Sequence, residues 1–230
     1  MSFPRYPAYK DSGVEWLGEV PEHWEVGTLT RISNRVVVGI AEAATHAYAE
    51  TGIAILRSTN IRAGKIIGEI LHITPEFAEG RATKLINAGD LVTVRTGNAG
   101  VTAVVPEDLD GCQCFTMLIT TLVKSSAPAF VCYAMNSVPS QKYFALEGWG
   151  TAQVNISVPT LKALPVAIPP TSEQLAIVEY LDRETGRLDN LVAASQKGIS
   201  LLQERRSALI SAAVTGQIDV RGLVAEASAA

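Results

Sequence analysis

Residues of the types that bind metals are sparse in this sequence and poorly spaced for that chemistry. Cys112 and Cys114 form a Cys-x-Cys pair, but Cys132 is the one further thiol. The three histidines stand singly, at His23, His46 and His72. A metal site needs several such ligands in a fixed geometry, so packed or surface roles suit these six residues better. We therefore expect neither a metal nor a cofactor.

Catalytic motifs are also missing from the sequence. Gly64-Lys65 lacks the upstream glycine and the following Ser or Thr of a nucleotide-binding loop. Residues 168–171 (IPPT) have the wrong flanks for the Asn/Asp-Pro-Pro-aromatic motif of methyltransferases. No HExxH, GxSxG, carboxylate pair or nucleophile–base arrangement can be recognised. The sequence therefore predicts a protein that is not itself an enzyme.

The bulk composition favours a folded protein with a buried core. The 230 residues are 47% hydrophobic and 18% charged, which disfavours disorder. No apolar run approaches the roughly 20 residues of a membrane span, and the first residues have no apolar signal core. Three cysteines are too few for a disulfide framework and suggest a reducing compartment. We therefore expect a cytoplasmic protein without a membrane partner.

The first three quarters of the chain read as one α+β globular domain. Strand-length β-branched runs, bounded by turn residues, occur at 36–38, 53–56, 66–70, 91–94, 101–105 and 115–123. Residues 128–146 have apolar positions at helical spacing, interrupted by Pro139, which predicts two short helices. We place this domain at residues 27–170. An irregular, aromatic and acidic N-terminal arm (residues 1–26) precedes it.

A long helix is predicted over residues 171–216, followed by a tail at 217–230. It starts directly after the pair Pro169-Pro170, with Thr171 as N-cap and Gln174 completing a capping box. No proline interrupts it, and Gly216 is a stop signal. At 1.5 Å per residue such a helix is roughly 65 Å long.

Heptad spacing marks one apolar stripe along this helix, of the kind that forms a coiled coil. We predict the pairing residues to be Val178, Leu181, Leu188, Val192, Ile199, Leu202 and Leu209. Three further core positions are polar, at Thr185, Ser195 and Arg206, and Ala213 occupies the last one. One small domain cannot cover a stripe of this length. The helix therefore needs a partner helix, from a second copy or from another protein.

Three separate segments carry a resemblance to a known family. They are residues 9–26 (YKDSGVEWLGEVPEHWEV), residues 150–170 with GTAQVNIS followed by LP and IPP, and residues 173–221 with EQLAIVEYLD, ERRSALI and AAVTGQIDVR. In this order they resemble the specificity subunits of type I restriction–modification systems. The stretch from about 27 to 150 matches only loosely, as expected for a part that differs between proteins reading different DNA.

The resemblance implies recognition of double-stranded DNA in a complex with a methyltransferase (modification) subunit and a nuclease–translocase (restriction) subunit. A usual member has two target-recognition domains and two long helices that pack antiparallel as a spacer. This sequence has one of each and so looks like half a specificity subunit. Two copies paired through the helix would rebuild that plan and read a palindromic bipartite site. A truncated gene product is the competing explanation.

Within this resemblance, candidate DNA contacts lie where strands give way to Gly/Asn turns. They are Arg57, Asn60, Arg62 and Lys65, then Arg95, Thr96 and Asn98, and finally Gln153 and Asn155. Arginine can read guanine, asparagine can read adenine, and threonine or backbone amides can contact phosphate. Solvated turn residues are the alternative for each position. Trp16, Trp24 and the helical stripe are candidate docking surfaces for the protein partners.

Charge gives this interpretation weak support. The chain has a net charge of −4 and a pI near 5.5, although free-standing nucleic-acid binders are usually basic. Residues 31–95 hold eight Lys and Arg against six Asp and Glu, and residues 9–26 hold one lysine against five acids. We therefore expect weak DNA binding by the chain alone. The alternative function is a coiled-coil scaffold with a protein-binding α+β head.

Overall fold

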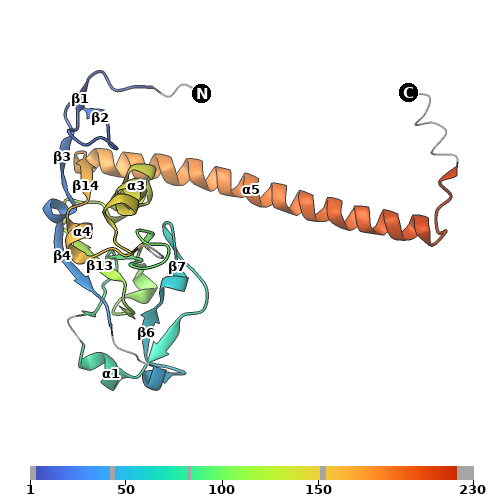
Figure 1. Cartoon of the computed structure of the whole chain (residues 1–230), viewed down its shortest axis with the longest axis horizontal. Helices are drawn as coiled ribbons and strands as arrows, with labels where there is room; N and C mark the ends of the chain where they lie inside the picture. The colour runs from blue at the N-terminus through green and yellow to red at the C-terminus, as the bar shows by residue number, and fades with distance from the viewer. Residues whose placement is uncertain (1–3, 42–44, 82–83, 151–153, 222–230) are drawn as a thin grey trace. The chain divides into compact units, whose positions relative to one another are not determined.

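The structure is a computed structural model that describes residues 4–41, 45–81, 84–150 and 154–221. The chain divides into two compact units, one extending to Val178 and one beginning at Glu179. The first mixes short strands with short helices, and α5 (Thr171–Val214) continues into the second (Figure 1). The predicted α+β class with a long C-terminal helix is confirmed.

A four-stranded antiparallel sheet holds much of the core of the first unit. Its order is β11-β10-β13-β4, with bounds Thr102–Val104, Leu91–Thr93, Leu118–Leu122 and Ser33–Val38. Each strand overlaps a predicted β-branched run, because such side chains pack well on a pleated, buried surface. The whole of β10 is buried, and the hydroxyl of Thr93 is satisfied by that of Thr102 at 2.9 Å.

A second sheet has the order β12-β6-β9-β5, with bounds Gln113–Cys114, Ile53–Leu56, Leu71–Ile73 and Tyr48–Ala49. The predicted strand at 66–70 is wrong over most of its length. Only β8 (Lys65–Ile66) forms there, paired with β7 (Ile61–Arg62). Gly68 has a φ of +78°, and the Asn60 amide binds the carbonyls of Ile67 and Glu69, so this stretch cannot extend a ladder.

The N-terminal arm is more regular than its composition indicates. β1 (Tyr9–Asp11) and β2 (Glu19–Pro21) form an antiparallel ribbon. β3 (Glu25–Thr28) then pairs with β14 (Pro165–Ile168), which ties the start of the unit to its end. The irregular arm expected from the glycine and proline content is therefore replaced by two backbone ladders.

Short helices complete the first unit. They are α1 (Pro75–Glu79), α2 (Pro128–Asn136), α3 (Val138–Glu147) and α4 (Val158–Lys162), with 3-10 turns at Leu29–Ile32, Thr45–Ala47, Ser58–Asn60 and Glu107–Leu109. The predicted break between two helices near Pro139 is confirmed, because Ser137 is extended and Pro139 lies in the first turn of α3. Val131, Met135 and Phe144 from these two helices lie in the largest buried cluster.

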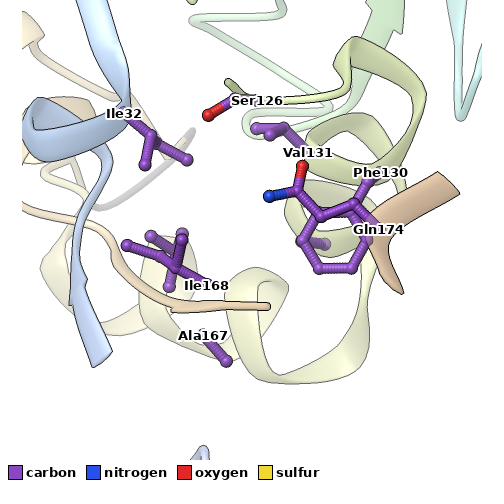
Figure 2. A pocket seen from close by; sticks show the side chains of 9 residues that line it. Ile32, Ser126, Phe130, Val131, Ala167, Ile168 and Gln174 are labelled. Carbon is purple, nitrogen blue, oxygen red and sulfur yellow. The ribbon is translucent and has the colours of Figure 1, made fainter. Parts of the chain in front are cut away.

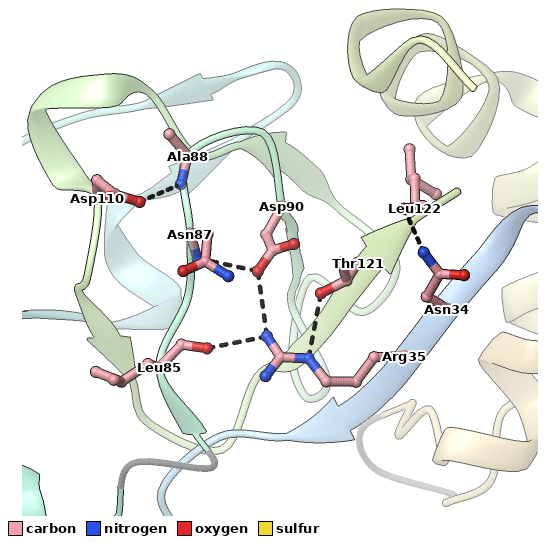
Figure 3. A network of polar contacts seen from close by, with 9 residues as sticks. All are labelled: Asn34, Arg35, Leu85, Asn87, Ala88, Asp90, Asp110, Thr121 and Leu122. Carbon is pink, nitrogen blue, oxygen red and sulfur yellow. Dashed lines mark hydrogen bonds and ion pairs between the residues drawn. The ribbon is translucent and has the colours of Figure 1, made fainter. Parts of the chain in front are cut away.

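An arginine network braces the sheet against a turn (Figure 3). The Arg35 guanidinium on β4 donates to Asp90 at 3.1 Å and to the Leu85 carbonyl at 2.9 Å. Its Nε donates to the Thr121 hydroxyl on β13. The Asp90 side chain is only 4% exposed and also accepts the backbone N–H of Asn87. Arg35 is therefore a structural residue, bound to three groups within the fold.

The start of α5 differs from the predicted capping box. The Pro170 carbonyl accepts the first helical N–H groups, so Thr171 lies inside the helix and its hydroxyl donates to the Ser125 carbonyl. The Gln174 amide is buried: it accepts from Ala127 N–H at 2.8 Å and donates to the Pro169 carbonyl at 2.9 Å. Figure 2 shows it among Phe130, Val131 and Ile168. Tertiary partners have replaced the local cap.

The other end of α5 follows the sequence prediction. Gly216 has a φ of +72°, which favours glycine, and its N–H bonds the Ala213 carbonyl. The N–H of Gln217 bonds the Ala212 carbonyl, which completes a Schellman-type stop. Among the described residues no helix is both long and apolar enough to cross a membrane.

Apolar side chains along most of α5 are exposed. Of the seven predicted pairing residues, Val178 and Leu181 are partly buried. The other five are 48–68% exposed: Leu188, Val192, Ile199, Leu202 and Leu209. Helices in water owe most of their stability to covering an apolar face, so this stripe is the feature of the second unit that needs explanation.

Candidate nucleic-acid interface

The first group of predicted contacts lies on a tight hairpin. β7 and β8 are joined by Ala63-Gly64, where Gly64 has a φ of +72°. Arg62 and Lys65 are directly opposite each other beside this turn, and both are exposed. The Gly64 N–H donates to the Thr102 carbonyl at 2.9 Å, which fixes the hairpin tip to β11. Two cations thus project from a braced two-residue turn.

The structure revises the expectation for Asn60. Its side chain is 3% exposed, and both ends of the amide are used within the loop. Oδ1 accepts the N–H of Arg57 at 3.0 Å, and Nδ2 donates to the carbonyls of Ile67 and Glu69. A base edge could bind only by breaking these bonds. We therefore regard Asn60 as a residue that shapes the hairpin rather than one that contacts a ligand.

Arg57 lies beside this loop and is only partly committed to it. Its terminal nitrogen donates to the Glu69 carbonyl at 3.1 Å. The Nε is buried without a hydrogen-bond partner in the described part of the chain. Among the described residues, the Arg57 guanidinium therefore has fewer hydrogen-bond partners than that of Arg35.

The second group lies on the loop between β10 and β11, residues 95–101. Gly97 and Gly100 have φ values of +86° and +91°. A side chain at Gly100 would lie 2.3 Å from the Phe144 ring, so the loop packs directly against α3. Thr96 and Asn98 are exposed on it. Arg95 is half-buried, and its Nε has no partner among the described residues.

Asn155 joins this loop from a distant part of the sequence. It forms an antiparallel bridge with Thr96, and the Thr96 hydroxyl donates to its side-chain oxygen. Gln153 lies outside the described residues. Sequence reasoning missed Trp149, which bridges Asn155 on its other side. The available signal was a lone tryptophan between Gly148 and Gly150.

The two groups are neighbours in the fold. The hairpin tip is bonded to Thr102, which directly follows the β10–β11 loop, and Ile61, Ile66 and Val101 pack in one cluster. Arg57 and Asn155, which are 98 positions apart in the sequence, therefore belong to connected elements.

The arginines of this region differ from Arg35 in their pairing. Arg62 donates to two backbone carbonyls, those of Thr59 and Ile61. Across the described residues, none of Arg57, Arg62 and Arg95 has a carboxylate partner. Arginines without acidic partners can bind phosphate or base acceptors bidentately. Their number is notable because the net charge of the whole chain is negative.

Both N-terminal tryptophans contact their own unit. The Trp16 ring lies 5.7 Å from that of Tyr143 on α3, and the Trp24 ring lies 5.8 Å from that of Tyr6. Tyr6 and His23 in turn bind the Glu173 carboxylate in the first turn of α5. The structure thus gives Trp16 and Trp24 intramolecular contacts and leaves both partly exposed, and docking of a partner protein there stays a prediction.

The cysteines are buried and unreactive. Burial raises the pKa of Cys112 and of Cys114 to about 12, and that of Cys132 to about 11. Such thiols stay protonated at neutral pH and are poor metal ligands. The described residues contain no group of three or more His, Cys, Asp or Glu placed to hold a metal ion.

Known proteins similar to this chain share one description. The chain is 25% identical over 217 residues to the type I restriction enzyme MjaVIII specificity subunit of Methanocaldococcus jannaschii, covering 90% of this chain and 49% of that protein. It is 22% identical over 209 residues to the EcoKI specificity subunit of Escherichia coli K12, covering 87% and 44%. The chain therefore spans about half the length of these curated relatives.

Solved structures show the same fold. A chain from a study of complex assembly and conformational transition of the type I R-M system matches with a TM-score of 0.67 and 18% identity, covering 84% of this chain and 46% of that chain. The HsdS subunit from Thermoanaerobacter tengcongensis matches with a TM-score of 0.55 and 22% identity, covering 80% and 48%.

The family model supplies the assignment. Residues 21–198, most of the chain, match the type I restriction modification DNA specificity domain. This family consists of non-catalytic specificity subunits, in agreement with the prediction that the chain is not itself an enzyme. The chain belongs to the family of type I restriction–modification DNA specificity domains.

Proposed function

We propose that the chain is the DNA-recognition component of a type I restriction–modification complex, in which its first unit reads one half of a bipartite target. The observation that carries this proposal is a set of three arginines, Arg57, Arg62 and Arg95, which lie on two connected elements and have no acidic partner within the described ranges. Exposed Lys65, Thr96 and Asn98, together with Asn155, complete the interface. Phosphate contacts orient it, and the side chains that reach base edges specify the sequence.

Two copies of the chain pair through α5. Five exposed apolar residues of the predicted stripe support this pairing, because a second α5 would cover them. Charge supports an antiparallel arrangement. Residues 179–190 hold four acids and two arginines, whereas residues 197–206 hold three bases and one acid. Antiparallel helices place each acidic segment opposite a basic one, which favours this orientation over the parallel one.

The paired helices set the spacing between two identical recognition units. Such a dimer reads an inverted repeat, because the two-fold axis of the protein matches that of the DNA. A helix of about 65 Å is long enough for half-sites one or more DNA turns apart, at about 34 Å per turn. The target is therefore palindromic with a nonspecific gap.

Other subunits provide the chemistry. The methyltransferase subunit and the nuclease–translocase subunit of the complex act on the DNA that this chain selects, in the cytoplasm. They also add phosphate contacts, which an acidic chain needs for strong binding at physiological salt. The names of the two curated relatives, both specificity subunits of type I restriction enzymes, support this role.

The test is enrichment of sequences from a random duplex DNA pool by the intact chain at low salt. We expect an inverted repeat to be enriched and the triple variant Arg57→Ala/Arg62→Ala/Arg95→Ala to lose it. A matched control removes three exposed lysines on other elements, Lys10, Lys124 and Lys162, and keeps the selectivity. If no sequence is enriched, even with a methyltransferase subunit added, the scaffold alternative is favoured.

A further inference from the structure

Trp149 is a large apolar side chain that the fold leaves exposed. It is 58% exposed and directly follows α3 and Gly148. The other two tryptophans pack against rings of their own unit, as described above. A tryptophan buries a large apolar area when it finds a partner, and tryptophan is enriched among residues that dominate binding interfaces.

The backbone at Trp149 is held rigidly. Its N–H donates to the Asn155 carbonyl at 3.0 Å, and the Asn155 N–H donates back at 2.9 Å. Gly148 packs so closely that a Cβ there would lie 2.4 Å from Val154 and 2.6 Å from the Phe144 carbonyl. The backbone that carries the ring is therefore held by two hydrogen bonds, which lowers the entropic cost of a contact through Trp149.

This frame connects Trp149 to the proposed DNA interface. Asn155 is directly opposite Trp149 on one side and directly opposite Thr96 on the other. Directly opposed residues of antiparallel strands project from the same face, so Thr96, Asn155 and Trp149 form one row. With strands about 4.8 Å apart, the backbone of Trp149 lies about 10 Å from that of Thr96. The hydrogen bond from Thr96 to Asn155 confirms the common face of these two.

We propose that Trp149 is a DNA-contacting residue that supplies the apolar part of this interface. The proposal rests on the proposed function of the first unit. The row combines a hydroxyl, an amide and an indole ring. The first two are groups that contact phosphate or base edges, and the ring packs against sugar or a thymine methyl beside them. A span of about 10 Å fits within a major groove about 12 Å wide.

Duplex DNA fits this row better than a protein partner does. Protein interfaces gather apolar residues at their centre, with a polar rim. Trp149 instead stands at the end of a row of polar residues. The backbone of this row is held by a further hydrogen bond, from the Ile156 N–H to the Arg95 carbonyl. Arg95 itself lacks a carboxylate partner among the described residues. A single ring in line with a hydroxyl and an amide matches the mixed surface of a DNA groove.

The experiment compares Trp149→Ala, Trp149→Phe and Val138→Ala in the full-length chain, using the duplex enriched from the random pool as the probe. Val138 is the matched control, because it is also an exposed apolar residue of the α3 region, at 68%, but lies outside the row. We expect Trp149→Ala to weaken binding about 10-fold or more, as an interface anchor does. Trp149→Phe retains most of the affinity, and Val138→Ala equals the wild type.

A second readout is independent of affinity. Trp149 is 58% exposed and the other two tryptophans are partly buried, so its fluorescence is the part most readily quenched by acrylamide. The enriched duplex should protect this fluorescence in the wild type, and a scrambled duplex at the same concentration should not. Equal binding by Trp149→Ala and wild type would overturn the inference and leave the proposed function standing. Failure of the wild type to enrich any sequence would overturn both.

Discussion

The two units of the chain differ in how far their apolar side chains are buried. In the first, Leu118, Ile119 and Phe144 are at most 1% exposed, within continuous buried clusters. In the second, Leu188 and Leu202 are 59% and 65% exposed. The first unit thus has its own core, whereas the second presents a surface that a partner helix would cover. We therefore expect folding and the proposed pairing to be separable properties of this chain.

The largest expected effect is loss of pairing. Val192→Asp with Ile199→Asp places two carboxylates in the stripe, where an unpaired buried charge costs several kcal/mol. We expect a dimer mass for the wild type and a monomer mass for this variant by light scattering. The control, Asn190→Asp with Ala194→Asp, adds the same two groups on the opposite face of α5 and should remain a dimer. A monomeric wild type would contradict the pairing.

A matched pair of leucines sharpens the contrast. Leu118→Ala should lower the free energy of unfolding of the first unit by about 2–5 kcal/mol, because it leaves a cavity in a closed core. Leu202→Ala should leave that unfolding unchanged and weaken only the dimer. Urea titration followed at several protein concentrations separates the two effects. Similar shifts in first-unit unfolding for both variants would show that α5 belongs to the same cooperative core.

A matched pair of arginines tests the same distinction for charge. Arg35→Met removes a guanidinium bound to Asp90 and should destabilise the first unit by about 3 kcal/mol, because a buried carboxylate loses its partner. Arg95→Met should change stability by less than about 0.5 kcal/mol and reduce DNA affinity about tenfold. The two measurements are urea unfolding and titration with the enriched duplex. The reverse pattern would remove Arg95 from the interface.

The smallest effect concerns the first turn of α5. Partial burial raises the pKa of Glu173, but hydrogen bonds from Tyr6 and His23 outweigh it, so the pKa lies below its ordinary value of 4.5. A lowered pKa in the folded state stabilises the fold above pH 4.5 and loses that contribution as the pH falls through the folded value. Glu173→Gln should cost less than about 1 kcal/mol at pH 7. The difference from wild type should shrink as the pH falls below 4.5.

Local sequence signals predicted much of the fold. The run at Ile53–Leu56 forms β6 over its full length, and Pro139 marks the break between α2 and α3. Gly216 lies in the capping motif that ends α5. These features depend on propensities of neighbouring residues. Gln174 was placed in a local capping box, but its partner Ala127 lies 47 positions away. No local pattern contains that information.

The candidate site was predictable only in part, for the same reason. Turn signals located Arg57, Arg62 and Arg95, and the fold leaves all three without acidic partners among the described residues. Asn60 has the residue type of a DNA contact, yet its amide is already hydrogen-bonded to carbonyls of its own loop. Trp149 could be recognised as a candidate contact only from its pairing with Asn155, which links it to the proposed interface. The residue type can be read from the sequence, whereas the fold decides whether that side chain is free to bind DNA.

The central claim is that the first unit reads the half-site and α5 measures the gap between half-sites. Inserting three heptads into α5 lengthens it by about 32 Å, or roughly 9 base pairs at about 3.4 Å each. Enrichment from a random duplex pool by this variant should return the wild-type half-sites with a gap longer by that amount. An unchanged gap, or altered half-sites, would contradict the account.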